Sequence, residues 1–301
     1  MDTGGDLSLG RLSWGLGTLM ASGGPPPAIP GYLMEGADEI VRLRIKDRTE
    51  ATAEQLRSTG FEELGPSAHV IDAGTGVGAV ALQMARLASL NHRDPTITLL
   101  DRSASRLAAA RDNLSPYDKI QQRYITCYIE EIPLPSNSVD YIFCRFVFEY
   151  LADAKKAFAE FDRVLKPGGR LVIGDLDHNS LNHYPLDPTL QKQLDELVVE
   201  VERAAVFDFF AGRKIYSHFY SADYLDVSVQ MYAHHLFYGS LPSADEYNWT
   251  AKLDRMLALQ HEGLLRLSFD LSEFRSRFLE FLRSPGRFSY TPLLLVAGTK
   301  P

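Results

Sequence analysis

The chain has 301 residues, of which 45% are hydrophobic and 11% aromatic, and its formal net charge is −8. This length is enough for one large domain with an elaboration or for two small domains. The acidic charge disfavours a nucleic-acid substrate, and no run of 18 apolar residues predicts a membrane span. Asp2 and Asp6 stand where a signal peptide carries basic charge, so we expect a cytoplasmic protein with no membrane partner.

The first 60 residues divide into an arm and a helix. Residues 1–30 contain two Gly-Gly pairs and the run Pro25-Pro26-Pro27, which predicts a flexible arm with a proline-rich hinge. The stretch from Glu35 to Gly60 is typical of a helix that ends at the glycine. Arg42 on this helix could meet a carboxylate with its two-pronged guanidinium group.

The most informative motif is a strand, loop and helix that begins at His69. An apolar strand leads through Asp72 to glycines at positions 74, 76 and 78, and an apolar helix follows over Ala79–Ala88. Glycine permits the backbone angles and the close ligand approach that such a turn needs, and the helix start presents free N–H groups. The next strand, 97–100, ends at Asp101, whose carboxylate can accept both hydroxyl hydrogens of a ribose. The motif therefore predicts a bound nucleoside.

Two nucleoside cofactors fit this loop. The spacing Gly74-x-Gly76-x-x-Ala79 satisfies the relaxed dinucleotide fingerprint, which leaves an NAD-dependent oxidoreductase as an alternative. Asp72 favours the other cofactor, because a buried carboxylate would repel a pyrophosphate. S-adenosylmethionine has no phosphate and carries an ammonium group.

Strands and helices alternate after this motif, which predicts a parallel sheet with right-handed crossovers. The helices are expected at Ala104–Asn113 and in a segment that Asp153 caps and Pro167-Gly168-Gly169 stops, and the strands at Tyr124–Ile129, Asp140–Cys144 and Arg170–Gly174. The tail departs from this alternation, with strand character at Val227–Tyr238 and Thr291–Thr299 and helices at Trp249–Gln260 and Leu271–Arg283. The cysteines Cys127 and Cys144 fall in apolar, strand-like surroundings, which favours core thiols over a disulfide, and no spacing fits a metal site.

Three ordered motifs make the chain similar to a known family. Asp72, Gly74, Gly76 and Gly78 match the pattern Asp/Glu-x-Gly-x-Gly-x-Gly of the class I S-adenosylmethionine-dependent methyltransferases. Residues 132–144 resemble the family's "LPFPDNSFDLVFC" segment, and residues 161–173 resemble its "RVLKPGGRLVI" segment. The resemblance implies an α/β fold with a doubly wound, mostly parallel seven-stranded sheet whose last strand is antiparallel. It implies a cofactor-binding core with its N-terminal helix over 31–175, and sheet completion with substrate-covering insertions over 176–301.

The resemblance also implies where S-adenosylmethionine is held. Asp101 would bind the ribose, Arg102 would adjoin the adenine, and Ile129 would offer its backbone N–H to the ring. The family often has Asp just before the position of Ile129, where it binds the adenine amino group, but Tyr128 stands there. Either Glu130 or a water molecule would then bind this amino group. Arg145 would lie beside the methionine part of the cofactor. The full set of predicted cofactor residues is Arg42, Asp72, Gly74, Thr75, Gly76, Asp101, Arg102, Ile129, Glu130 and Arg145.

The acceptor side carries fewer signals, because methyl transfer from a sulfonium mainly needs alignment of the nucleophile and exclusion of water. A polar loop, 175–184, follows the predicted fifth strand, and we expect His178 or Asn179 to line the acceptor pocket. Glu149 could orient the acceptor. The predicted strand places His234 and His235 on opposite faces, so at most one of them would face the site.

These observations predict methyl transfer to a small-molecule acceptor. The segment 144–148 after the predicted fourth strand lacks the Asn/Asp-Pro-Pro-Tyr/Phe motif, which disfavours amide and adenine nitrogens as acceptors. A non-catalytic, cofactor-binding regulatory protein is a further alternative, and the sequence leaves a homodimer open.

Overall fold

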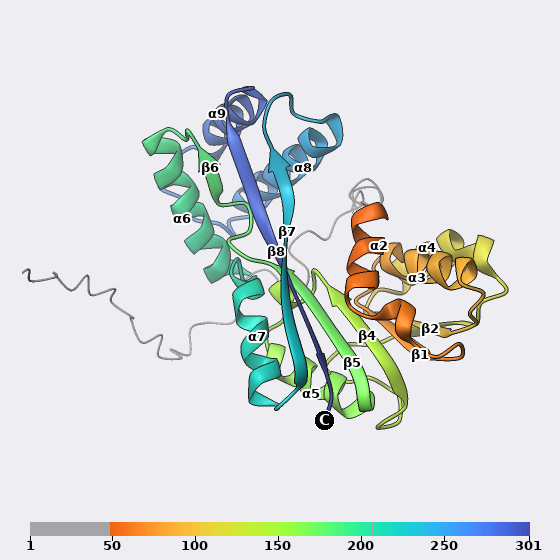
Figure 1. The fold of residues 1–301 in the computed structure, drawn as a ribbon. Helices are drawn as coiled ribbons and strands as arrows, with labels where there is room; N and C mark the ends of the chain where they lie inside the picture. The colour runs from red at the N-terminus through yellow and green to blue at the C-terminus, as the bar shows by residue number, and fades with distance from the viewer. Residues whose placement is uncertain (1–48, 206) are drawn as a thin grey trace, which may run out of the picture.

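A single mixed sheet organises the fold of the computed structural model, which describes residues 49–205 and 207–301. Its strand order is β3-β2-β1-β4-β5-β8-β6, and β7 also pairs with β8 (Figure 1). The strands in chain order are β1 (His69–Ala73), β2 (Thr96–Asp101), β3 (Gln122–Thr126), β4 (Val139–Arg145), β5 (Leu165–Leu176), β6 (Asn182–Tyr184), β7 (Leu225–Phe237) and β8 (Phe288–Thr299).

The last strand is antiparallel to its neighbours, as the family resemblance implied. Strands β1 to β5 pair in parallel, whereas β5, β6 and β7 each pair antiparallel to β8. The described sheet has eight strands rather than the predicted seven, because β8 is longer than its ladder with β5. That ladder ends at the pair Leu176 and Leu293, and the short β6 takes the remaining length at Tyr290–Phe288.

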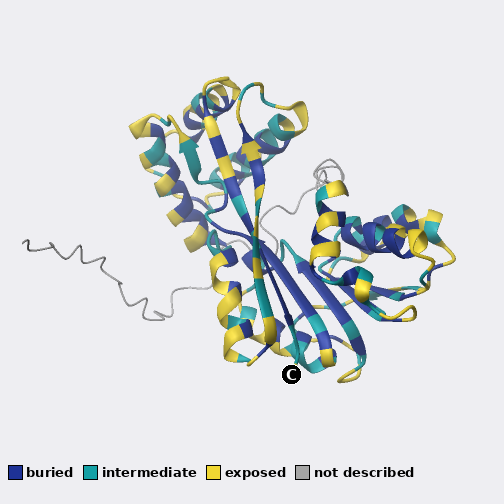
Figure 2. Cartoon of the chain, viewed as in Figure 1, coloured by how far each residue is buried: buried dark blue, intermediate teal, exposed yellow. Residues whose placement is uncertain are grey.

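Helices cover the sheet in three groups (Figures 1 and 2). One apolar cluster joins α2, α3 and α4 to one face of the sheet, and a second joins α5 and α7 to the other face. A third cluster unites α6, α8 and α9, which Figure 1 shows gathered around the far ends of β7 and β8. The helix bounds are α2 (Thr49–Ser58), α3 (Ala79–Leu90), α4 (Ala104–Leu114), α5 (Ala154–Val164), α6 (Pro188–Ala204), α7 (Ala211–Ser221), α8 (Ser243–His261) and α9 (Leu271–Arg283).

Several predicted elements differ from the observed ones at their ends. The helix capped by Asp153 is confirmed, but it already ends at Val164, and Pro167-Gly168-Gly169 lies inside β5. Strand β3 ends at Thr126, before Ile129, because the chain turns there and Glu131 N–H bonds to Tyr128 O. The predicted arm and most of the predicted helix before Gly60 fall outside the described residues. No helix in the described part of the chain is both long and apolar enough to cross a membrane.

The turn between β1 and α3 is held by a buried carboxylate. Asp72 is only 2% exposed, and its Oδ2 accepts hydrogen bonds from the Thr75 hydroxyl at 2.5 Å and from Ala81 N–H at 3.0 Å. Burial raises the pKa of Asp72 to about 6, against the lowering effect of these two donors. The side chain thus ties the loop to the first turn of α3 rather than facing solvent.

The raised pKa of Asp72 predicts a pH dependence of stability. The folded state binds the proton more tightly than the unfolded chain, whose Asp pKa is near ~3.9. The resulting stabilisation is present below pH 4 and is lost as the pH rises through about 6. Relative to Asp72→Asn, the wild-type free energy of unfolding should fall by about 3 kcal/mol between those limits, measured by urea titration across the pH range. Thr75→Val should extend the loss of stability to higher pH. Parallel curves of the free energy of unfolding against pH for wild type and Asp72→Asn would contradict the raised pKa of Asp72.

The start of α7 depends on a glycine. A Cβ on Gly212 would lie 2.8 Å from Asp175 O and 3.0 Å from Leu176 O, so the helix presses directly on the β5 backbone. Gly212→Ala should therefore lower the free energy of unfolding by about 1–3 kcal/mol despite alanine's better helix propensity. Gly286→Ala is the matched control, because a Cβ there meets nothing within 4 Å. Equal stability of the two variants in urea unfolding would rule out this close packing.

Candidate active site

The glycine loop lies at the carboxyl edge of the sheet, where β1 is flanked by β2 on one side and β4 on the other. The strand order reverses at this place, which is where ligands bind in open α/β sheets. Gly74 has φ 69°, and a Cβ there would lie 2.4 Å from Val147 Cγ2. The loop after β1 therefore packs closely on the segment after β4, and no larger residue fits.

Asp101 organises the loop from the end of β2. Its Oδ2 accepts from Gly76 N–H and its Oδ1 from Ser103 N–H, both at 2.9 Å. Each carboxylate oxygen can accept a second hydrogen bond, so the pair retains capacity for two vicinal hydroxyls. Arg106 Nη1 lies 3.8 Å from Asp101 Oδ1. Two carboxylates, Asp72 and Asp101, thus flank the loop, which fits a ribose without a phosphate better than a pyrophosphate.

The other predicted cofactor residues lie on several elements. Arg102 is exposed, the Ile129 side chain is buried in the turn after β3, and Glu130 beside it is half-buried. Tyr128, which stands in the place of the family's usual Asp, is 65% exposed. Arg42 lies outside the described residues.

Arg145 is the last residue of β4, and its side chain reaches α2. Its Nη1 donates to Thr52 Oγ1 at 3.0 Å and to Gln55 Oε1 at 2.7 Å, so it docks α2 at the carboxyl edge. Its guanidinium also lies 5.0 Å from the ring centroid of Phe146. Phe146 has φ 60°, a left-handed backbone that is uncommon outside glycine and concentrates at functional sites.

The fold brings two of the three predicted acceptor residues together. Asn179 Nδ2 donates to Glu149 Oε2 at 2.8 Å, and both side chains are at least 95% buried. Asp175, at the end of β5, accepts from Glu149 N–H and so fixes the segment after β4. This series of hydrogen bonds continues beyond Asn179. Ser180 Oγ donates to Asn179 Oδ1 at 2.9 Å, and Lys252 Nζ donates to Ser180 Oγ at 3.2 Å.

The histidines that the sequence pointed to, His178, His234 and His235, have surroundings different from those of Asn179. His178 Nδ1 lies 2.6 Å from Asn182 Oδ1, and its ring packs near Phe210, so it is held by its own loop. The prediction that His234 and His235 point to opposite faces is wrong. Their ring centroids are 4.0 Å apart and both side chains are buried. The reason is an irregularity of β7 between His234 and Phe237, together with φ 33° at His235.

A cavity opens between the polar wall at Glu149 and Asn179 and the helices α6, α8 and α9. The cavity volume is about 100 Å³, and the space between the lining side chains, counted together with open solvent, is about 800 Å³. Its lining is mostly apolar and aromatic: Leu194, Leu197, Val198 and Val201 from α6, Phe207 and Phe209, Trp249, Leu253 and Met256 from α8, and Phe274 and Phe278 from α9. Ser180 and Lys252 complete the polar wall. From sequence, Phe207 and Phe209 were candidates for an apolar acceptor pocket, but the lining residues of α6, α8 and α9 were not identified. The spacing of Leu190, Leu194, Leu197 and Val201 is nevertheless a signal for a buried helix face.

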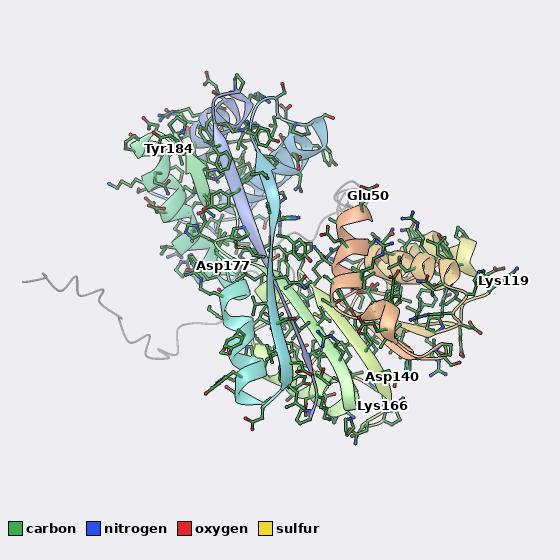
Figure 3. The ribbon with its side chains drawn as sticks, viewed as in Figure 1. Glu50, Lys119, Asp140, Lys166, Asp177 and Tyr184 are labelled. Carbon is green, nitrogen blue, oxygen red and sulfur yellow. The ribbon has the colours of Figure 1, made fainter. Side chains whose placement is uncertain are left out.

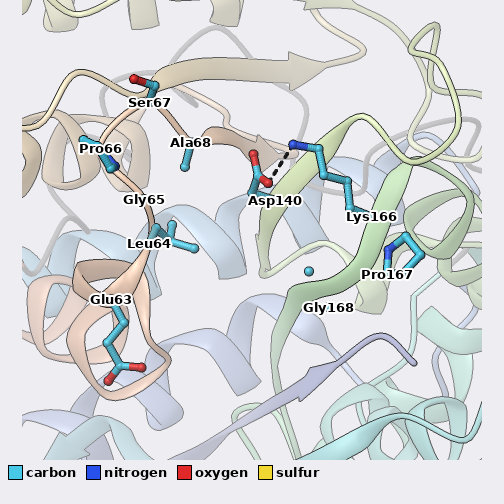
Figure 4. Close-up of a pocket in the computed structure, with 11 residues that line it drawn as sticks. Glu63, Leu64, Gly65, Pro66, Ser67, Ala68, Asp140, Lys166, Pro167 and Gly168 are labelled. Atoms are coloured by element: carbon cyan, nitrogen blue, oxygen red, sulfur yellow. Dashed lines mark hydrogen bonds and ion pairs between the residues drawn. The ribbon is translucent and has the colours of Figure 1, made fainter.

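A second hollow lies at the opposite, amino end of the strands. Figure 3 shows Asp140 and Lys166 far from Asp177, which marks the carboxyl side. Figure 4 shows this hollow, where Lys166 Nζ pairs with Asp140 Oδ1 at 2.7 Å beside the segment 63–68. Its distance from the glycine loop separates it from the candidate active site. The described residues hold no group of three or more His, Cys, Asp or Glu arranged for a metal.

Comparisons with known proteins identify methyltransferases as relatives of this chain. A family model described as "Methyltransferase domain" matches residues 71–173. A Thermoplasma volcanium protein named as a cobalt-precorrin-6B C(15)-methyltransferase (decarboxylating) is 32% identical over 161 residues, which cover 52% of this chain and 76% of that protein. The ubiquinone/menaquinone biosynthesis C-methyltransferase UbiE of Rickettsia akari is 31% identical over 107 residues, 35% of this chain but only 43% of that protein.

The fold has solved counterparts as well. The crystal structure of the YcgJ protein from Bacillus subtilis superposes with a TM-score of 0.55 at 20% identity, covering 84% of this chain and 99% of that one. The ordered motifs, the sheet with its reversed last strand and the relative that is matched over three quarters of its length all agree. The chain belongs to the class I S-adenosylmethionine-dependent methyltransferases.

Proposed function

We propose that this methyltransferase binds S-adenosylmethionine over the β1–α3 loop and methylates a small apolar molecule held in the cavity under α6, α8 and α9. The observation that carries the proposal is the shared wall: the Glu149–Asn179 pair lines the cavity and also lies at the carboxyl edge that carries the glycine loop. The cofactor and acceptor sites would therefore meet at this pair.

The chain's own residues would hold the cofactor in distinct ways. Asp101 would accept the ribose hydroxyls with the oxygens that already orient Gly76 and Ser103. Asp72 would act indirectly, by fixing the loop through Thr75 and Ala81. Bound S-adenosylmethionine supplies a methyl group on a positive sulfur.

The polar wall would handle the acceptor. Asn179 orients the Glu149 carboxylate, which leaves that carboxylate able to accept a proton or a hydrogen bond from an acceptor hydroxyl, amine or acidic carbon. The apolar lining would exclude water and hold the nucleophile in line with the methyl group, a positioning effect worth several kcal/mol. Glu149 and Asn179 would thus act at the acceptor, whereas His178 would support the loop.

The cofactor part of the proposal predicts a selective loss of binding. Asp101→Asn should weaken S-adenosylhomocysteine binding by roughly tenfold or more, because an amide offers one acceptor oxygen in place of two. Isothermal titration calorimetry would measure this, with Asp112→Asn on the exposed face of α4 as the matched control. Unchanged affinity in Asp101→Asn, or tight binding of NADH to the wild type, would contradict the proposed cofactor site.

The acceptor part predicts a separable effect. Val198→Phe places a ring into the cavity from α6. It should therefore abolish turnover or strongly raise the KM for the acceptor, while the affinity for S-adenosylhomocysteine stays unchanged. Turnover would be followed as S-adenosylhomocysteine release over a panel of small aromatic acids, phenols and isoprenoids. Val199→Phe, one position along on the exposed side of the same helix, is the control. Turnover that Val198→Phe does not affect would place the acceptor elsewhere.

A further inference from the structure

Strand β7 forms an edge of the sheet. Among the strands that the structure describes it pairs with β8 alone, in an unbroken register from Ser228 opposite Ala297 to His234 opposite Thr291. Figure 1 shows β7 in front of β8, with α7 to one side. The outer side of an edge strand carries a row of backbone N–H and C=O groups, which makes it a template for pairing with another chain.

The usual protection of an edge strand is missing from β7. Natural edge strands avoid pairing by being short or by carrying charged side chains, prolines or bulges. Strand β7 is 13 residues long, and residues 227–238 contain no Asp, Glu, Lys, Arg or Pro. Its register shifts lie before and after the stretch 228–234, which is itself regular. This stretch of β7 can therefore accept a further strand.

One face of the stretch is both exposed and apolar. Val229 and Met231 are 53% and 73% exposed, and Ala233, the next residue on that face, is exposed as well. The other face is held within the chain, because the Ser58 hydroxyl of α2 donates to Gln230 Oε1 at 2.8 Å. A partner strand would therefore bury apolar side chains on the face that carries Met231.

Two exposed tyrosines of α7 flank this face. Phe219 packs in the cluster that covers the sheet, and the His218 ring stacks on Phe158 of α5 with 5.6 Å between the centroids. The helical period then turns Tyr216 and Tyr220 away from α5, which is the side of β7. Their rings lie 6.2 Å apart, and the two residues are 48% and 71% exposed.

We propose that β7 pairs with the β7 of a second copy of this chain, antiparallel about a two-fold axis, so that one sheet runs through both copies. Such a contact is isologous and closes as a dimer, which leaves neither β7 edge unpaired. Because α7 lies near the start of β7, antiparallel pairing brings the later part of the partner strand beside the two α7 tyrosines. Each copy then places its tyrosines against the exposed apolar face of the other.

A second copy suits this surface in charge and in size. The chain carries a net charge of −8, so two copies can approach closely only where the surface is uncharged, as it is over residues 227–238. The exposed parts of Tyr216, Tyr220, Val229 and Met231 provide on the order of 500 Å² of surface, taking roughly 200 Å² for each large side chain. The backbone edge of β7 adds to this area, which brings it toward the about 800 Å² per partner of a stable interface. The inference goes beyond the proposed function, since the contact uses neither the cofactor loop nor the acceptor cavity.

Sedimentation velocity on the full chain tests the dimer. Wild type should be mostly dimeric at about 50 µM, above the micromolar dissociation constant that an interface of this size can have. Met231→Lys places a charge in the middle of the contact and should raise the dimer dissociation constant by at least about tenfold. Tyr220→Ala should change it in the same direction. Val199→Lys is the matched control, because Val199 is 65% exposed on α6, and this variant should dimerise like wild type.

Amide hydrogen exchange shows whether the backbone edge makes the contact. The amides of 228–234 that point away from β8 should exchange at least about tenfold more slowly in wild type than in Met231→Lys at the same concentration. Equal exchange in α4 would show that the variant has kept its fold. A wild type that is monomeric at about 50 µM, a dimer that Met231→Lys leaves intact, an equal loss in Val199→Lys, or equal exchange over 228–234 would overturn the inference.

Discussion

The ladder between β8 and its three neighbours is the constraint on which the arrangement of the two halves depends. Strand β8 pairs with β5 over its carboxyl-terminal part, with β6 at its start and with β7 along most of its length. Because β8 extends past the end of β5, it carries backbone pairing beyond the cofactor-binding core. The cluster of α6, α8 and α9 is built on this extension, and the cavity comes to lie beside the carboxyl edge.

Three carboxylates, from β1, β2 and β5, hold the loop segments at that edge of the sheet. Asp72 is fully enclosed and gives the loop its shape, while Asp101 bonds to loop N–H groups from the end of β2. Asp175 accepts the backbone N–H of Glu149 and thereby joins the end of β5 to the segment after β4. Each of these carboxylates accepts at least one backbone N–H and so joins two segments of the chain. These hydrogen bonds hold the loop where a ribose would bind and hold Glu149 at the border with the cavity.

Local patterns in the sequence were sufficient for the core. The glycine spacing, the apolar strands and the Asp153 cap describe neighbouring residues, and the structure confirms the corresponding elements within a few positions. The same reasoning failed at His234 and His235, because a shift in strand register reverses the alternation on which it depends. The same reasoning also could not find the cavity, because Trp249, Ser180 and the α6 residues are far apart in sequence. The apolar cluster of α6, α8 and α9 and the contact of Ser180 with β8 bring them together. Asn179 and Glu149 were selected from their places after strands, but their contact is a tertiary one.

A crystal structure of the protein with S-adenosylhomocysteine would show whether the cofactor and acceptor sites meet at the Glu149–Asn179 wall. The ribose hydroxyls should lie within hydrogen-bond distance of the Asp101 carboxylate. The sulfur should face the wall formed by Glu149 and Asn179, with an open path into the cavity beneath α6, α8 and α9. Cofactor bound away from Asp101, or a sulfur separated from that cavity by protein, would show that the two sites do not meet there.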